Sequence, residues 1–235
     1  MTHLVIGLGE VGAALQRVLK CEGLDPGKGI KGTMVSYYEM LHICFPYSPE
    51  FEAQVNAYKK KFNPKILVIH STVPIGTSKK LGACHSPIRG KHPKLADSIR
   101  TFTKYVGGTQ AREVAAEFSK LGLRAYPVKS SDDTEAGKLF DLMQYGISIL
   151  LNKEIRKYCD AHGLDFDTVY RRFNSSYNAG WVGMAQPQFV RQILEFKPGP
   201  IGGHCVVQMM HLLDSPSAKQ IIKENEKYGG PKANE

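Results

Sequence analysis

The segment His3-Leu4-Val5-Ile6-Gly7-Leu8-Gly9-Glu10-Val11-Gly12 decides the fold of this chain. A short apolar run ends in glycine and is followed by helix formers from Ala13 to Lys20, which predicts a buried strand, a tight turn and a helix. Residues 7–12 fit the pattern G-x-G-x-x-G: the first glycine permits the turn, the second lets the backbone approach a pyrophosphate, and the third lets helix and strand pack closely. We therefore expect a dinucleotide site here, with Glu10 and Val11 beside the glycines and the phosphates at the helix N-terminus.

Strand and helix patterns then alternate along the chain. Further strands are expected at Leu41–Phe45, Ile66–Ile69 and Tyr105-Val106, and helices at Pro49–Phe62 and Gln110–Leu121. Alternation of this kind predicts an α/β fold, a Rossmann-like doubly wound parallel sheet covered on both faces. Residues that directly follow the strands are expected to contact the cofactor, namely Phe45, Pro46, Ser71 and Thr72.

Asp25 is the candidate for binding the adenosine ribose, because an acidic residue is expected about 20 positions beyond the glycine motif. Gly23-Leu24-Asp25-Pro26-Gly27 is equally an ordinary turn sequence. Asp25 favours NAD, whereas the nearby Lys28 and Lys31 leave NADP open.

The second part of the chain is expected to be helical. Helical spacing of apolar residues predicts one long helix over residues 132–162, with cap candidates at Ser131-Asp132-Asp133 and a stop at Gly163. A shorter helix is expected from Asp165, a break at Asn174–Gly183, and a polar helix at Lys219–Lys227. The expected organisation is a dinucleotide-binding domain over residues 1–130, a helical dimerisation domain over 131–214 and a polar tail over 215–235.

Composition narrows the class of protein. The 235 residues contain five widely spaced cysteines without a C-x-x-C pair, which disfavours a disulfide framework or a zinc site and favours the cytoplasm; no metal is expected. No apolar run is long enough to span a membrane. The formal net charge of +9 suits an anionic small molecule, but the lysines are dispersed, which disfavours nucleic acid as a partner.

Three segments resemble motifs of the UDP-glucose/GDP-mannose dehydrogenases, in family order and over about residues 3–212. Ser71-Thr72-Val73-Pro74-Ile75-Gly76-Thr77 is similar to the STVPxGT loop, and Thr134-Glu135-Ala136-Gly137-Lys138-Leu139 to the start of the central helix. Lys197-Pro198-Gly199-Pro200-Ile201-Gly202-Gly203-His204-Cys205 resembles the segment that carries the family's nucleophilic cysteine.

The resemblance implies oxidation of an alcohol by NAD, with Cys205 as the nucleophile and Lys138 stabilising the oxyanion. It places Thr72 near the nicotinamide and a catalytic water, and a homodimer on the long helix. His204, next to the cysteine, either tunes the thiol or caps a loop. A buried small cysteine and a solvated helix lysine are the simpler readings of Cys205 and Lys138. Candidates for binding an anionic or sugar-like substrate are Arg89, Lys91, His92 and Asn178.

The chain also departs from the family pattern. Leu142 stands where the family has asparagine, Met209 where it has aspartate, and Ser86-Pro87-Ile88 where it has SPE. Water activation for thioester hydrolysis then has no clear general base, although Asp141, Gln144 or Asn178 could substitute. Few residues follow the cysteine, so the family's second nucleotide-binding domain is not expected. Two alternatives stay open: a hydroxyacid-type dehydrogenase or reductase that uses Lys138, and a dinucleotide-binding protein without catalysis.

Overall fold

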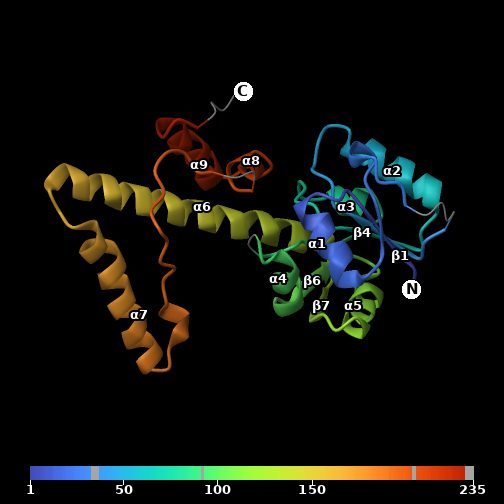
Figure 1. Cartoon of the computed structure of the whole chain (residues 1–235), viewed down its shortest axis with the longest axis horizontal. Coiled ribbons are helices and arrows are strands. Elements are labelled where there is room, and N and C mark those ends of the chain that lie inside the picture. The colour runs from blue at the N-terminus through green and yellow to red at the C-terminus, as the bar shows by residue number, and fades with distance from the viewer. Residues whose placement is uncertain (33–36, 91–92, 203–204, 231–235) are drawn as a thin grey trace. The chain divides into compact units, whose positions relative to one another are not determined.

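The computed structural model describes residues 1–32, 37–90, 93–202 and 205–230. The chain forms two compact units, Met1–Lys138 and Leu139–Glu235. Figure 1 shows the sheet in the first unit and only helices and irregular segments in the described part of the second.

The first unit is built on a seven-stranded sheet of order β2-β1-β3-β4-β5-β6-β7. Its strands are β1 (His3–Ile6), β2 (Glu22–Leu24), β3 (Met40–Ile43), β4 (Ile66–Ile69), β5 (Cys84–His85), β6 (Lys104–Gly107) and β7 (Ala125–Val128). Neighbouring strands are parallel except β5 and β6, which are antiparallel. The predicted α/β Rossmann-like class is therefore confirmed.

Helices cover the sheet on two faces. They are α1 (Glu10–Leu19), η1 (Pro26–Lys28), α2 (Phe51–Phe62), α3 (Thr77–Lys80), α4 (Leu95–Thr101) and α5 (Ala111–Lys120). Alternate residues of β1 enter different cores: Val5 packs with residues of α1, α4 and α5, whereas Leu4 and Ile6 pack with residues of α2. This alternation follows from the period of two in a strand and explains why the strands are apolar throughout.

The long helix α6 (Ser131–His162) supplies residues 131–138 to the first unit and 139–162 to the second. It begins one residue before the predicted span, so the expected caps within Ser131–Asp133 lie in the helix. Ser130 takes the cap role instead, because its hydroxyl accepts a hydrogen bond of 3.1 Å from the backbone N–H of Asp132.

The rest of the second unit consists of η2, a π-helical segment (Asp167–Arg172), α7 (Phe173–Gly183), η3 (Pro187–Phe189), α8 (Val207–Met210) and α9 (Pro216–Lys227). The predicted break at Asn174–Gly183 is wrong, since these residues form most of α7. The predicted polar helix at Lys219–Lys227 is present within α9, but its residues Ala218, Ile221 and Ile222 are buried in a core shared with α6 and α8.

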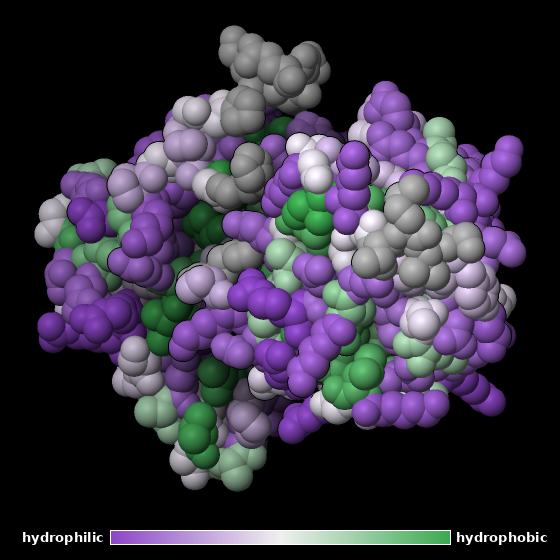
Figure 2. Space-filling view, turned by 45° about the vertical axis from the view of Figure 1, so that its right-hand side comes forward, coloured by the Kyte–Doolittle hydropathy of each residue, from purple (hydrophilic) through white to green (hydrophobic). Residues whose placement is uncertain are grey.

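The surface is mainly hydrophilic on the face drawn in Figure 2, where green hydrophobic patches interrupt the purple. Within the part of the chain that the structure describes, no helix is both long and apolar enough to cross a membrane.

Candidate functional site

Two glycines of the turn after β1 are required by the fold itself. Gly7 has φ +86°, and a Cβ there would lie 2.7 Å from the backbone nitrogen of Phe45. A Cβ on Gly12 would lie 1.8 Å from the carbonyl oxygen of Gly7, so α1 could not approach β1. The tight turn and the close packing predicted from the sequence are thus both observed.

Gly9 differs from its two neighbours in the motif. A Cβ on Gly9 would meet no heavy atom within 4 Å, and its φ of −64° suits any residue. Gly9 is the N-cap residue of α1, where free N–H groups and the helix dipole favour an anion. The fold does not require glycine here, so the effect of Gly9 is to leave open space at the N-terminus of α1. In the first turn of that helix Glu10 is exposed and Val11 is half-buried.

Asp25 directly follows β2, the position expected for a ribose-binding carboxylate. Its carboxylate accepts hydrogen bonds from the backbone N–H groups of Leu8 at 2.8 Å and Lys28 at 3.2 Å. The Lys28 ammonium in turn donates to the carbonyl of Leu8 at 2.6 Å. Asp25 therefore caps a turn and also ties that turn to the glycine loop, whereas its role in binding a ribose stays a prediction.

The loops after β1, β3 and β4 meet at one edge of the sheet. The chain reverses direction across the sheet between β1 and β3, so their carboxyl ends form the switch point where ligands bind in such folds. Ser71 donates a hydrogen bond of 2.6 Å to the carbonyl of Phe45, which itself abuts Gly7. Pro46 is exposed and Thr72 half-buried beside them. The structure thus brings the predicted cofactor contacts together on one edge.

Two residues of this edge were missed in the sequence analysis. The Glu135 carboxylate is buried and accepts hydrogen bonds from the N–H groups of Gly76 at 2.6 Å and Ser78 at 2.8 Å, which fixes the loop after β4. His85 is buried between the Ser71 carbonyl at 3.2 Å and the Thr134 hydroxyl at 2.9 Å, and burial lowers its pKa to about 3. The sequence did offer a signal for Glu135, because it is the acidic residue of the Thr134–Leu139 motif. No pattern in the sequence around His85 indicated a role for that residue.

Lys138 and Cys205 belong to different units. Lys138 is half-buried on α6 and is the last residue of the first unit, while Cys205 is exposed in the second. Two of the three departures from the family pattern are apolar by environment as well as by type: Leu142 is buried in the core of the second unit, and Met209 packs against that core.

The predicted substrate residues are placed as follows. Arg89 is exposed after β5, whereas Lys91, His92 and His204 lie outside the described residues. The Asn178 side chain makes two hydrogen bonds of 2.8 Å with the backbone of Arg191. Its amide nitrogen donates to the Arg191 carbonyl, and its amide oxygen accepts from the Arg191 N–H. Asn178 therefore holds a backbone segment within the second unit.

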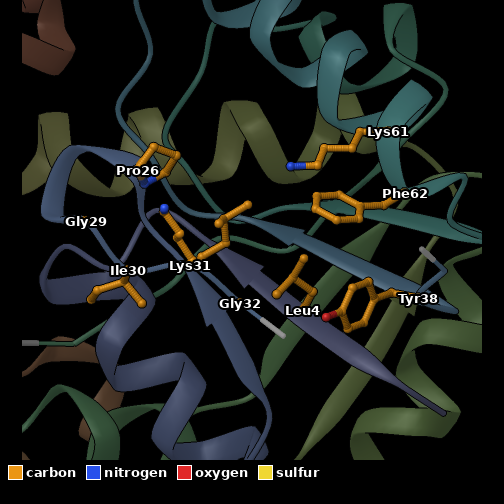
Figure 3. Close-up of a pocket in the computed structure, with 10 residues that line it drawn as sticks. Leu4, Pro26, Gly29, Ile30, Lys31, Gly32, Tyr38, Lys61 and Phe62 are labelled. Atoms are coloured by element: carbon orange, nitrogen blue, oxygen red, sulfur yellow. The ribbon is translucent and has the colours of Figure 1, made fainter. Parts of the chain in front are cut away.

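A cavity of about 390 Å³ adjoins the Asp25 turn on the α2 face of the sheet. Figure 3 shows the aromatic rings of Tyr38 and Phe62 and the side chain of Leu4 on one side of the cavity. The side chains of Lys31 and Lys61 also line the cavity. Pro26 and Gly29 lie at the end next to Asp25, and most of the lining is apolar. The described lining of this cavity suits a flat apolar ring.

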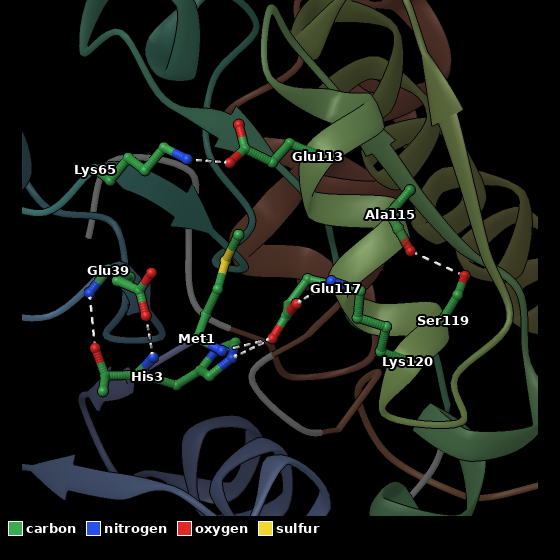
Figure 4. Close-up of polar contacts among 10 residues, drawn as sticks. Met1, His3, Glu39, Lys65, Glu113, Ala115, Glu117, Ser119 and Lys120 are labelled. Atoms are coloured by element: carbon green, nitrogen blue, oxygen red, sulfur yellow. Dashed lines mark hydrogen bonds and ion pairs between the residues drawn. The ribbon is translucent and has the colours of Figure 1, made fainter.

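A buried row of imidazoles crosses the opposite face of the sheet. The carbonyl of Ser86 lies 2.6 Å from Nδ1 of His70 and can only accept, so this nitrogen carries the hydrogen. Donation then runs from Nδ1 of His42 to Nε2 of His70 at 2.9 Å, and from Nδ1 of His3 to Nε2 of His42 at 3.0 Å. At the outer end Nε2 of His3 faces the Glu117 carboxylate at 3.2 Å, where one hydrogen must be shared (Figure 4). Burial lowers the pKa of His42 and His70 well below its ordinary value, so these rings are neutral.

Comparison with known proteins supports the fold. No family model and no curated protein matches the chain. The UDP-D-ManNAc dehydrogenase of Pyrococcus horikoshii is 16% identical, with a TM-score of 0.71 over 97% of this chain and 69% of its own. The 3-hydroxyisobutyrate dehydrogenase of Mycobacterium tuberculosis is 13% identical, with a TM-score of 0.71 over 97% of this chain and 93% of its own. Psf3 in complex with NADP+ and 2-OPP is 12% identical, with a TM-score of 0.60 over 96% and 93%.

Proposed function

We propose that this protein is a nicotinamide-dinucleotide-dependent oxidoreductase that acts on a small or sugar-like alcohol. The observation that carries the proposal is the turn at residues 7–12, where Gly7 and Gly12 are required by packing and Gly9 is not. A glycine with no structural need, at the N-terminus of the first helix and beside Asp25, is what a bound pyrophosphate demands. Two fold neighbours are dehydrogenases and a third, Psf3, is in complex with NADP+, which supports the same proposal.

The residues present fit such a cofactor. The α1 N-terminus would hold the pyrophosphate, Asp25 would accept from the ribose hydroxyls, and Ser71 and Thr72 would lie toward the nicotinamide. The cofactor supplies a hydride acceptor for the alcohol carbon. NAD is favoured by Asp25, while Lys28, whose ammonium lies at the same turn, would pair with a 2′-phosphate and keeps NADP open.

Titration calorimetry with NAD+ and NADP+ tests this proposal. Gly9→Val should weaken binding of the preferred dinucleotide at least tenfold, because the side chain fills the space for the phosphates, while thermal stability stays near that of the wild type. Gly180→Val is the matched control, since a Cβ on Gly180 also meets nothing within 4 Å. Equal affinity in the wild type and the Gly9 variant would refute the site.

Two substrate classes compete. In the sugar-dehydrogenase reading, the Cys205 thiolate would attack the aldehyde formed first, and Lys138 would stabilise the oxyanion. In the hydroxyacid reading, Lys138 would take the hydroxyl proton and Cys205 would be incidental. The second candidate is supported by the 3-hydroxyisobutyrate dehydrogenase, whose fold matches this chain with the same TM-score of 0.71 as the sugar dehydrogenase.

Turnover assays of two variants separate the candidates. With nucleotide sugars and 3-hydroxy acids as substrates, Cys205→Ser should abolish formation of acid only in the first reading, whereas Lys138→Met should lower kcat in both. Dinucleotide binding without turnover of either substrate class would favour the non-catalytic alternative.

A further inference from the structure

An irregular segment in the second unit is held by side chains. Residues 190–202 form no helix or strand. Backbone N–H and C=O groups that are buried there therefore need hydrogen-bond partners outside regular secondary structure. Leu194 donates its N–H to the Tyr170 hydroxyl at 3.0 Å, and its carbonyl accepts from the Asn152 amide at 3.2 Å. The described segment ends at Gly202, close to Cys205 in the sequence, so what fixes it also restricts the position of that residue.

Lys153 makes the strongest of these attachments. Its side chain from α6 is only 3% exposed, and its ammonium donates to the carbonyls of Lys197 at 2.7 Å and Gly199 at 2.6 Å. The ammonium also lies 5.6 Å from the ring centroid of Phe196 and 4.9 Å from that of Tyr228. A buried cation gains most from charge-assisted hydrogen bonds of this kind and from aromatic faces, and it loses most when they are removed.

The next residues are anchored from α9. The Asn225 side chain, itself 1% exposed, accepts a hydrogen bond of 2.6 Å from the backbone N–H of Ile201. Ile201 and Val206 are both buried in the core of the second unit, whereas Gly202 and Cys205 between them are exposed. The chain is therefore attached to the core at Ile201 and again at Val206, on either side of Cys205 in the sequence.

We propose that Lys153 and Asn225 are positioning residues that set the Lys197–Ile201 segment and thereby the position of Cys205. This role rests on the proposed function, since it concerns access to the same site. Neither residue touches the reacting atoms; each acts through backbone groups of the segment. Lys153 does so as a cation, so a neutral side chain of similar length cannot replace it, while arginine retains the donors and the charge.

Hydrogen exchange followed by mass spectrometry tests the attachment without any assay of activity. Lys153→Met should speed exchange in peptides covering residues 194–202 at least tenfold, with residues 206–222 unchanged, and Lys153→Arg should restore most of the protection. Lys157→Met, an exposed lysine on the same helix, is the matched control and should behave as the wild type. Unchanged exchange at 194–202 in the Lys153→Met variant would overturn the proposal.

A second pair of measurements covers the case in which Lys153→Met does not fold. In the wild type, acetylation by an N-hydroxysuccinimide ester should modify Lys157 readily and leave Lys153 unmodified; equal modification would overturn the proposal. Asn225→Leu should release the Ile201 N–H and speed exchange of that amide alone, and persistent protection there would count against the anchor.

Kinetics distinguish positioning from simple structural support. For a substrate that the wild type turns over, Lys153→Met should lower kcat at least tenfold with KM changed less than threefold, and Lys153→Arg should recover kcat. Loosened exchange with an unchanged kcat would overturn the positioning role. If no form of the protein shows turnover while exchange responds as expected, the attachment stands and the proposed function fails.

Discussion

At Glu135 a carboxylate is buried within the first turns of α6 and accepts two backbone hydrogen bonds from the loop after β4. Its place near the helix N-terminus offsets part of the cost of burying a charge. We expect Glu135→Ala to destabilise the protein by about 2–4 kcal/mol, because two backbone donors lose their partner. Urea unfolding measures this, with Asp133→Ala, an exposed carboxylate on the same helix, as the control that should change stability by less than about 0.5 kcal/mol. An equal effect in both variants would contradict the role given to Glu135.

Single residues of the site differed in how far the sequence could place them. Gly7 and Gly12 were predictable because each has a separate steric duty in a local turn, whereas the role expected of Gly9, room for a pyrophosphate, stays a prediction. Asp25 was predictable in position but not in its hydrogen bond to Leu8, which depends on the register of β2 against β1. His85 could not be predicted, since its partners come from the loop after β4 and from α6, distant in sequence.

Among the elements, the central strands and the helices with a clear apolar period were predicted within one to three residues at each end. The helix α7 was missed because Asn174–Gly183 is rich in small and polar residues, and none of its residues is buried to give a helical period. The two-residue strand β5 was missed because it is too short for a pattern to register. For β5 the pairing with β4 and β6, rather than local preference, determines the structure.

The strand β6 places a lysine in the interior of the first unit, 5.5 Å from the ring centroid of Phe118. Burial lowers the pKa of Lys104 to about 7 from its ordinary value of 10.5. Between pH 10.5 and 7 the unfolded chain therefore binds a proton that the folded chain does not. Above pH 10.5 this group does not reduce the free energy of unfolding, and that free energy falls as the pH is lowered toward 7.

Lys104→Met should remove that dependence. The free energy of unfolding of the variant, relative to the wild type, should rise as the pH is lowered from 10 to 7, by up to about 1.4 kcal/mol per pH unit. Urea unfolding at several pH values gives this difference. Lys79→Met, at an exposed position in α3, should show a difference that does not vary with pH. A constant difference for Lys104→Met as well would show that Lys104 is charged in the folded protein.

For the whole molecule, the exposed apolar surface of the second unit bears on assembly. Phe140, Ile147, Leu151 and Tyr158 of α6 are each exposed by 42–57%. Their separations of seven, four and seven residues place them on one face of the helix. A monomer in water gains nothing from such a stripe, whereas two copies that pair along it would bury it.

We therefore predict a homodimer formed along this stripe of α6. Light scattering should give a mass near twice 26.1 kDa at micromolar concentration. Leu151→Glu should raise the dimer dissociation constant at least tenfold, because it places a carboxylate within an apolar contact without disturbing the core. Tyr126→Glu on β7, which replaces a side chain of comparable exposure in the first unit, is the control and should leave the mass unchanged. A monomeric wild type over the whole micromolar range would exclude this dimer, and a dimer unaffected by Leu151→Glu but dissociated by Tyr126→Glu would place the contact on the first unit instead.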